Sequence, residues 1–322
     1  MIVKKRTIPL KILACEALLN RLPPNFEKRP LIEKDLAKRK AGFRGEVATD
    51  YYINKLTDKE FTIVKNLRLS NGHEYFQIDT FILSPTFALI LETKNISGTL
   101  LFDSKFKQLI RYMNDNEDGF LDPITQAERQ KREFKNWLQQ RNISIPIKYL
   151  VMISNPSTVI KTDPKNYVAF KVVLHAHELL DRIEKMQKSF TEEKYTQREI
   201  KRIAKLLVTS HTPEKVNVLE KYKISVSALI TGVQCPKCKP SPMKRIYGTW
   251  FCPVCKLKDK AAHYQALLDY CLLIGSSITN QQFREFLRLS SPDITKKLLF
   301  SMNLPHSGLN KGRIYHLDIL IR

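Results

Sequence analysis

Three β-rich segments in the first third of the chain constrain its fold more than any other feature. They cover residues 61–69, 75–84 and 87–96, and only the turn-forming segments Ser70-Asn71-Gly72 and Ser84-Pro85-Thr86 separate them. Connections this short make consecutive strands antiparallel neighbours. The sequence therefore predicts a three-stranded meander.

Helical patterns lie on both sides of this meander. Apolar residues repeat at helical spacing from Phe43 to about Leu56, and Asp122 followed by Pro123 is typical of a helix start. The remaining predicted elements are the rest of that helix to about residue 141, strands at 147–153 and 167–174, and a helix at 177–188. Strands alternating with helices predict an α/β domain.

Charge is the property in which this chain departs most from an average globular protein. Its 322 residues include 54 Lys and Arg but 32 Asp and Glu, which gives a formal net charge of +22. Residues 45–184 carry 18 bases and 18 acids, so the surplus lies in the segments on either side. A surplus of this size predicts a polyanionic partner, nucleic acid rather than a membrane.

The sequence shows no pattern typical of membrane insertion or secretion. Its apolar runs fall far short of the ~20 residues that a spanning helix needs. Lys11 and Glu16 interrupt the apolar stretch near the start, and six cysteines are too few for a disulfide scaffold. A cytoplasmic location is expected. The chain also lacks a G-x-x-x-x-G-K phosphate loop, which argues against ATP hydrolysis.

Two carboxylates face each other in the predicted hairpin. With the turn centred on Pro85-Thr86, the numbers of opposed residues sum to 171, which places Asp79 opposite Glu92. Lys94 shares a face with Glu92 because side chains alternate along a strand. Facing carboxylates repel unless a cation lies between them, and Mg²⁺ (or Mn²⁺) held by Asp79 and Glu92 would suit phosphodiester hydrolysis, with Lys94 orienting the attacking water. Taken alone, the pattern also fits an ordinary solvated strand face.

These residues belong to a larger pattern. It consists of Gly45-Glu46, Gln77-Ile78-Asp79, Leu91-Glu92-Thr93-Lys94 followed by Gly98, and Asp122-Pro123-Ile124-Thr125-Gln126. The pattern resembles the nuclease-related domain (NERD), a branch of the PD-(D/E)XK restriction-endonuclease-like superfamily, over about residues 45–190. That resemblance implies a mixed sheet flanked by helices and Mg²⁺-dependent nuclease chemistry. It also implies active-site roles for Glu46, Asp79, Glu92, Lys94 and Gln126.

A cysteine-rich segment predicts a structural zinc site. Two C-x-x-C pairs are separated by 13 residues, and a hairpin predicted at 243–251, with Gly248 in its turn, would bring the pairs together around one Zn²⁺. Disulfides or free core thiols are the alternatives. The segment resembles the four-cysteine zinc fingers appended to bacterial topoisomerase I and to some NERD proteins. The four ligands would be Cys235, Cys238, Cys252 and Cys255.

Basic and aromatic residues in the C-terminal part predict contact with DNA. Basic side chains can meet phosphates, and an exposed aromatic can stack on an unpaired base, which suits single-stranded or distorted DNA. Trp250 is the predicted stacking residue, and a role as cover for the zinc site is its alternative. Three helical patterns and a strand in the tail predict a winged helix whose recognition helix carries Lys296 and Lys297, with an architectural or protein-binding role as the alternative. The predicted phosphate contacts near the zinc site are Lys237, Lys239, Lys244 and Arg245.

The sequence predicts five parts and one main function. The parts are a basic helical extension (1–42), a nuclease-like α/β domain with a restriction-endonuclease-like mixed sheet (43–190), a helical connector (191–232), a zinc ribbon (233–260) and a winged-helix-like module (261–322). The predicted function is Mg²⁺-dependent cleavage of DNA, single-stranded or branched forms included. The main alternative is a DNA-binding or regulatory protein that uses the nuclease fold without cleaving. A structural adaptor in a mobile-element or defence complex is a third, and no protein partner is indicated.

Overall fold

The chain divides into two compact units, each made of two separate stretches of sequence. A computed structural model describes residues 1–56 and 61–321, apart from the side chains of residues 240, 241 and 311. The first unit comprises residues 1–7 and 40–214, and the second comprises residues 8–39 and 215–322. Most of the predicted N-terminal extension, residues 8–39, therefore groups with the C-terminal region. The finer division into five parts stays a prediction.

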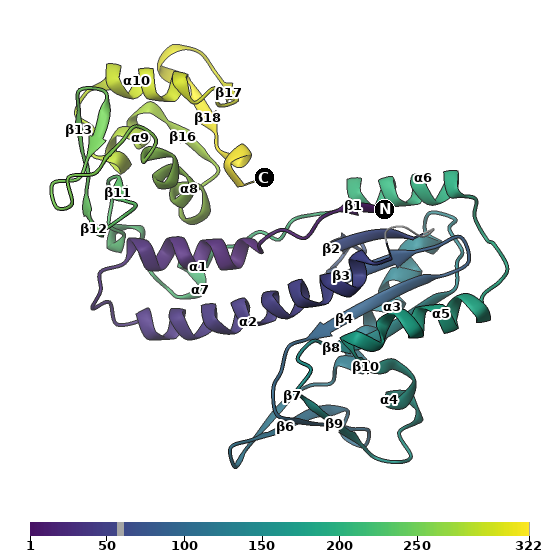
Figure 1. The fold of residues 1–322 in the computed structure, drawn as a ribbon. Coiled ribbons are helices and arrows are strands. Elements are labelled where there is room, and N and C mark those ends of the chain that lie inside the picture. Colours follow the sequence, from purple (N-terminus) through teal and green to yellow (C-terminus); the bar gives the residue numbers. More distant parts are fainter. Residues whose placement is uncertain (57–60, 322) are drawn as a thin grey trace. The chain divides into compact units, whose positions relative to one another are not determined.

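A six-stranded sheet forms the centre of the first unit (Figure 1). The strands β2, β3 and β4, defined below, are consecutive antiparallel neighbours, so the predicted meander is confirmed. The other three strands run parallel to their neighbours, which makes the sheet mixed. In spatial order the strands are β1 (Ile2–Lys4), β2 (Thr62–Ser70), β3 (Tyr75–Leu83), β4 (Ala88–Lys94), β8 (Ile147–Ile153) and β10 (Val173–His175).

Helices cover both faces of this sheet. On one face, α3 (Pro123–Gln139) and α6 (Gln197–Thr209) bury Phe134 and Ile200 against the sheet. On the other face, the end of α2 (Arg29–Asn54) and α5 (Leu179–Ser189) bury Ile53 and Ile183. The side chain of Asp122 accepts hydrogen bonds from two backbone N–H groups of α3, as its predicted capping role requires. A mixed sheet flanked by helices confirms the predicted fold class.

The first unit also differs from the prediction in several elements. The helix expected to open at residue 43 is the end of the longer α2, so Glu46 lies inside a helix rather than in its first turn. Gly45 is required there because an added Cβ would lie 2.3 Å from the Cβ of Asn95. The strand expected at 167–174 is confirmed only at its end, in β10. Residues 167–172 instead form a short helix, α4 (Tyr167–Val172), which Asn166 caps by accepting a hydrogen bond from the backbone N–H of Ala169.

A second sheet in the first unit was not predicted. Its outer strand is largely exposed and carries polar residues, so it lacks the alternation from which strands are recognised. Helix α6, predicted as part of a connector, packs into the core of the unit through its apolar side. The second sheet has the order β7 (Asn116–Leu121), β6 (Gln108–Met113), β5 (Thr99–Asp103) and β9 (Val159–Thr162).

The second unit combines helices with three small sheets. The helices are α1 (Leu10–Arg21), the start of α2, α7 (Val218–Lys221), α8 (His263–Leu273), α9 (Asn280–Leu287) and α10 (Pro292–Ser301). The sheets are β11 (Gln234–Cys235) with β12 (Lys239–Pro242); β13 (Lys244–Ile246), β14 (Thr249–Phe251) and β15 (Lys258–Asp259); and β16 (Ser277–Thr279), β18 (Ile314–His316) and β17 (His306–Ser307).

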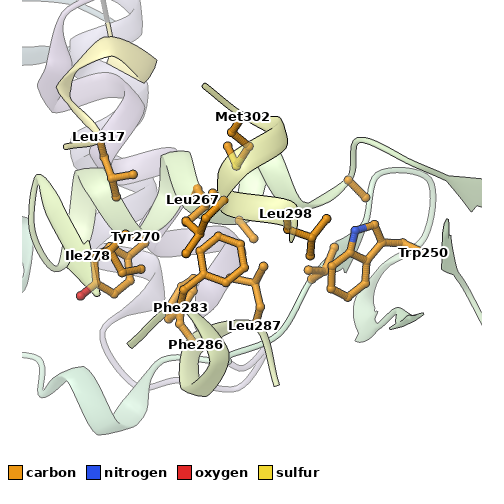
Figure 2. Packing of buried hydrophobic residues seen from close by; sticks show 14 of the residues in the cluster. Trp250, Leu267, Tyr270, Ile278, Phe283, Phe286, Leu287, Leu298, Met302 and Leu317 are labelled. Carbon is orange, nitrogen blue, oxygen red and sulfur yellow. The ribbon is translucent and has the colours of Figure 1, made fainter. Parts of the chain in front are cut away.

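The cysteine-rich segment and the C-terminal tail share one hydrophobic core. Trp250 packs in the same cluster as Leu267, Phe286 and Leu298 of the three tail helices (Figure 2). The ribbon is therefore not packed as a module apart from the tail. A buried ion pair, 2.7 Å from Arg21 Nε to Asp269 Oδ2, joins α1 to α8 within this unit.

Across residues 1–56 and 61–321, none of the helices is both long enough and apolar enough to cross a membrane.

Candidate functional site

Asp79 lies at an irregular point of the central sheet. The pairs between β3 and β4 run from Leu83 opposite Ala88 to Thr80 opposite Leu91, so opposed residues sum to 171, but the pairing ends one residue before the predicted pair of Asp79 and Glu92. One residue further along β3, the carboxylate of Asp79 accepts a hydrogen bond from the backbone N–H of Thr93 at 3.1 Å. On its other side, β2 is interrupted at Asn66, which has a φ of 50°. Asp79 therefore turns its side chain toward β4.

Glu92 is the centre of a side-chain network on the α3 face of the sheet. Its carboxylate is 2% exposed. Oε1 accepts hydrogen bonds from Lys94 Nζ at 2.6 Å and from Gln126 Nε2 at 2.7 Å, and Oε2 accepts one from Gln130 Nε2 at 2.8 Å. Lys94 Nζ also donates to Gln126 Oε1 at 3.0 Å. The structure thus brings together three residues predicted from the sequence, Glu92, Lys94 and Gln126, and adds Gln130.

Glu46 joins the site through a residue that the sequence did not single out. The guanidinium of Arg6 pairs with Glu46 and, at 3.1 Å, with Asp50, and only 3% of its side chain is exposed. Arg6 Nη1 also donates to Asn66 Oδ1 at 2.7 Å and to the backbone oxygen of Asp79 at 3.3 Å. Arg6 therefore links α2 to the interrupted point of the sheet. No local pattern marked it, because it stands in a short basic run near the start of the chain.

The electrostatics of the site favour a bound cation. Burial raises the pKa of Asp79 well above its usual range, and the nearby Glu92 and Glu46 carboxylates raise it further. Burial also raises the pKa of Glu46, against the opposing effect of Arg6. Within the described residues, Asp79 makes no ion pair. A divalent cation would supply the missing positive charge and stabilise the ionised carboxylates.

The acidic site fits a metal that keeps part of its water shell. Among the residues that the structure describes, the cysteine cluster is the one group of three or more His, Cys, Asp or Glu whose ligand atoms lie within 4.8 Å of one another. The acidic site does not bring three carboxylates that close. Mg²⁺ is commonly bound by one or two carboxylates together with several waters. Two carboxylates and several waters are therefore the kind of ligand set that this site can offer.

The four predicted zinc ligands do come together. The sulfurs of Cys235 and Cys255 lie 3.5 Å apart, and those of Cys238 and Cys252 lie 3.4 Å apart. The backbone N–H of Cys255 lowers the pKa of the Cys252 thiol to about 6, which favours the thiolate that a metal requires. Four sulfurs in one cluster fit a tetrahedral, closed Zn²⁺ site.

Trp250 is not available for stacking on a base, so this part of the prediction is wrong. Its side chain is 1% exposed, and its Nε1 donates a hydrogen bond to Nδ1 of His263 at 3.2 Å. Arg245, which is paired with Trp250 across the hairpin, lies over the indole ring at 5.2 Å. The physical reason is the shared core, in which Trp250 lies beside Leu298 of α10 (Figure 2).

The opposite face of the same hairpin carries a different set of residues. Opposed residues of antiparallel strands share a face, so Lys244, Phe251 and Lys258 form a row across β13, β14 and β15. Phe251 is half-buried and both lysines are exposed. Tyr247, in the turn, is fully exposed. The position of the turn sets the strand register, and the register decides which residues share a face of the hairpin. This was the signal in the sequence that could have placed Trp250 and Phe251 on opposite faces.

The remaining predicted nucleic-acid contacts lie on exposed positions. Lys237 is exposed, and Lys239 donates a hydrogen bond to the side chain of Asn20 at 3.0 Å. Lys296 and Lys297 are exposed on α10. The tail has the element order helix, strand, helix, helix, strand, strand, with its three strands in one sheet.

The comparisons with known proteins identify one region of the chain. Residues 41–154 match the model of the nuclease-related domain family. This region includes the five residues predicted for the active site, and it does not extend to the cysteines. No curated protein and no solved structure matches the chain. The matched residues include β3, β4 and α3, which build the acidic site, whereas Arg6 lies outside them.

Proposed function

We propose that the protein is a divalent-metal-dependent nuclease that hydrolyses phosphodiester bonds in DNA. The observation that carries this proposal is the environment of Glu92, whose buried carboxylate is held by Lys94, Gln126 and Gln130 and whose charge acts on the half-buried Asp79. Lys94 is a single cation for two interacting carboxylates, and a bound metal ion would stabilise both in their ionised form. The match of the surrounding segment to the nuclease-related domain supports the same reading.

Each residue has a definable role in this proposal. Bound Mg²⁺ or Mn²⁺ would polarise the phosphate and lower the pKa of a coordinated water. Asp79 and Glu92 would hold the ion, and the Thr93 N–H fixes the carboxylate of Asp79. Lys94 would place its ammonium near the attacking water and the phosphoryl oxygens, where charge develops during the reaction. Gln126, which is hydrogen-bonded to both Glu92 and Lys94, would hold these two side chains in position relative to each other.

The second unit would contribute affinity for DNA. The four cysteines would hold one structural Zn²⁺ and thereby order the hairpin between the two cysteine pairs. On its outer face, Phe251 between two lysines, with Tyr247 at the turn, suits an unpaired strand, because lysines meet phosphates and aromatics stack on bases. Lys237 and Lys239 would add phosphate contacts near the zinc site. In the tail, read as a winged helix, Lys296 and Lys297 would contact the DNA backbone.

One observation favours the non-cleaving alternative. Both oxygens of Glu92 already accept hydrogen bonds from side chains, and Glu46 is paired with Arg6. A metal at Glu92 must therefore use the free lone pair of Oε2 or displace Lys94 or Gln126 from Oε1. If neither happens in the presence of metal, the fold would serve DNA binding or regulation without cleavage.

The test compares isosteric variants in a cleavage assay with plasmid, linear, single-stranded and branched DNA. The wild type should cleave in Mg²⁺ or Mn²⁺ and not in EDTA. Asp79→Asn and Glu92→Gln should each lose about 100-fold or more of the rate, because each removes a metal ligand, and should still bind DNA. Glu117→Gln, an exposed change in the same unit, should cleave like the wild type. DNA binding that persists in EDTA, with no cleavage by the wild type in either metal, would establish the alternative.

A further inference from the structure

Helix α6 presents one basic face to solvent and one apolar face to the protein. Four basic side chains at i, i+3, i+4 and i+7 are exposed, whereas Ile200, Ile203 and Leu207 are buried against the sheet. We propose that the basic face of α6 is a track for the phosphate backbone of nucleic acid on the first unit itself. The inference rests on the proposed function and adds a substrate-binding surface to it. The track consists of Arg198, Lys201, Arg202 and Lys205.

The protein offsets the charge of this track only in part, because one acid, Glu199, attracts Arg202 and the other three bases have no acidic partner on the helix. Within the described part of the chain, none of its four side chains makes an ion pair or a hydrogen bond. Glu199 is the acid in this helix, and its carboxylate accepts hydrogen bonds from the backbone N–H and the hydroxyl of Thr196 at the helix start. At a rise of 1.5 Å per residue, four positive charges lie within about 10 Å along the helix. Such a density is complementary to the closely spaced phosphates of a nucleic acid strand.

The track is anchored to the strand that borders the acidic site. Beyond the C-terminal end of α6, His211 Nδ1 accepts the backbone N–H of Arg68 at 3.1 Å, and the N–H of Thr212 donates to the Arg68 oxygen at 2.9 Å. Arg68 lies on β2, two residues beyond Asn66, whose side chain accepts a hydrogen bond from Arg6. A nucleic-acid strand bound along α6 would therefore contact a helix that is fixed to the same sheet that positions Asp79.

The packing of α6 favours nucleic acid over an anionic membrane. A helix that binds a membrane surface inserts a free apolar face between the lipids. In α6 that face is already buried in the core of the first unit, so only the charges are available. Charges without an apolar face are sufficient for binding to phosphates, which depends on counterion release. The track would thus give sequence-independent affinity to the unit that performs the proposed cleavage.

The experiment is a salt titration of DNA binding by the full-length protein in EDTA. A variant with the four track residues changed to Gln is compared with a matched variant in which four exposed lysines elsewhere in the first unit are changed to Gln. For duplex DNA, a plot of log Kd against log salt concentration has a slope of about 0.9 for each phosphate contact. The track variant should bind at least tenfold more weakly at low salt, with a slope smaller by about 3, for DNA of any sequence. The matched variant carries Lys105→Gln, Lys107→Gln, Lys161→Gln and Lys165→Gln.

Two further arms separate the possible failures. Arg198→Lys with Arg202→Lys keeps the charge, so wild-type slope and affinity are expected, and their loss would overturn the proposal. An unchanged slope in the track variant of a protein that still cleaves DNA would overturn the track alone. A wild type that neither binds nor cleaves DNA would instead refute the proposed function. Loss of binding to phosphatidylserine vesicles without loss of DNA binding would assign the face to membranes and also overturn the proposal.

Discussion

Replacing Arg6 with methionine should lower the free energy of unfolding of the first unit by about 3 kcal/mol. The guanidinium is almost fully buried and pairs with Glu46 and Asp50. Methionine fills a similar volume but cannot donate a hydrogen bond. The change leaves two carboxylates in a partly buried position without their main cation, and removal of one partner of a buried pair typically costs about 3–5 kcal/mol.

The structure places the expected value at the lower end of that range. The side chains of Glu46 and Asp50 are 18% and 17% exposed, so water can relieve part of the penalty. Asp50 also keeps Lys65, whose Nζ lies 3.1 Å from Oδ1. The penalty should shrink further as pH falls, because the carboxylate of Glu46, whose pKa burial raises, can then take up a proton. The difference between wild type and variant should therefore be largest near pH 7.

The assay can follow the first unit by itself. The chain has two tryptophans, Trp137 in the first unit and Trp250 in the second. In a Trp250→Phe background, tryptophan fluorescence during urea unfolding reports on the first unit. Arg132→Met, an exposed arginine on α3, is the control and should change stability by less than about 0.5 kcal/mol. A loss below about 1 kcal/mol for Arg6→Met would refute the claim that Arg6 ties α2 to the sheet.

Four further results are expected. Lys94→Ala should lose turnover more than metal affinity, and calorimetry showing Mg²⁺ binding reduced as much as in Asp79→Asn would contradict the proposed role of Lys94. Without metal, Asp79→Asn should be more stable than the wild type, because the negative charge that burial disfavours at this position is gone. Cys252→Ser should release the zinc, measured by elemental analysis, and should destabilise the whole second unit, since the ribbon shares its core; stoichiometric zinc in the variant would exclude the site. Burial, and after it the charge of Lys4, lowers the pKa of His211 to about 4. As pH falls, His211 therefore takes up a proton in the unfolded chain before it does so in the folded one, and the free energy of unfolding should fall by about 1–2 kcal/mol from pH 6.5 to 4. His211→Gln should reduce this pH-dependent loss, whereas His73→Gln, a change at an exposed histidine, should not.

The sequence by itself determined those features that depend on neighbours in the chain. Short turns and the alternation of side chains fixed the pairing of β3 with β4, and with it the position of Asp79 one residue beyond the pair of Thr80 and Leu91. Asp122 and Pro123 marked the start of α3 because capping is a local interaction. The spacing of the cysteines was likewise sufficient to predict their cluster.

The tertiary structure decided what comes together from distant parts of the chain. Arg6 reaches Glu46 across 40 residues, and Gln130 reaches Glu92 across 38, and no local pattern carries such pairings. Trp250 is an aromatic on a short hairpin in either case, but packing of that hairpin on α8 makes it a core residue rather than a binding residue. Helix α6 has the composition of a connector, yet its apolar side completes the core and fixes where its charges lie. An apolar periodicity shows that one side of a helix or strand is buried. Only the folded chain shows which segment covers that side, because burial depends on all the segments that meet at one place.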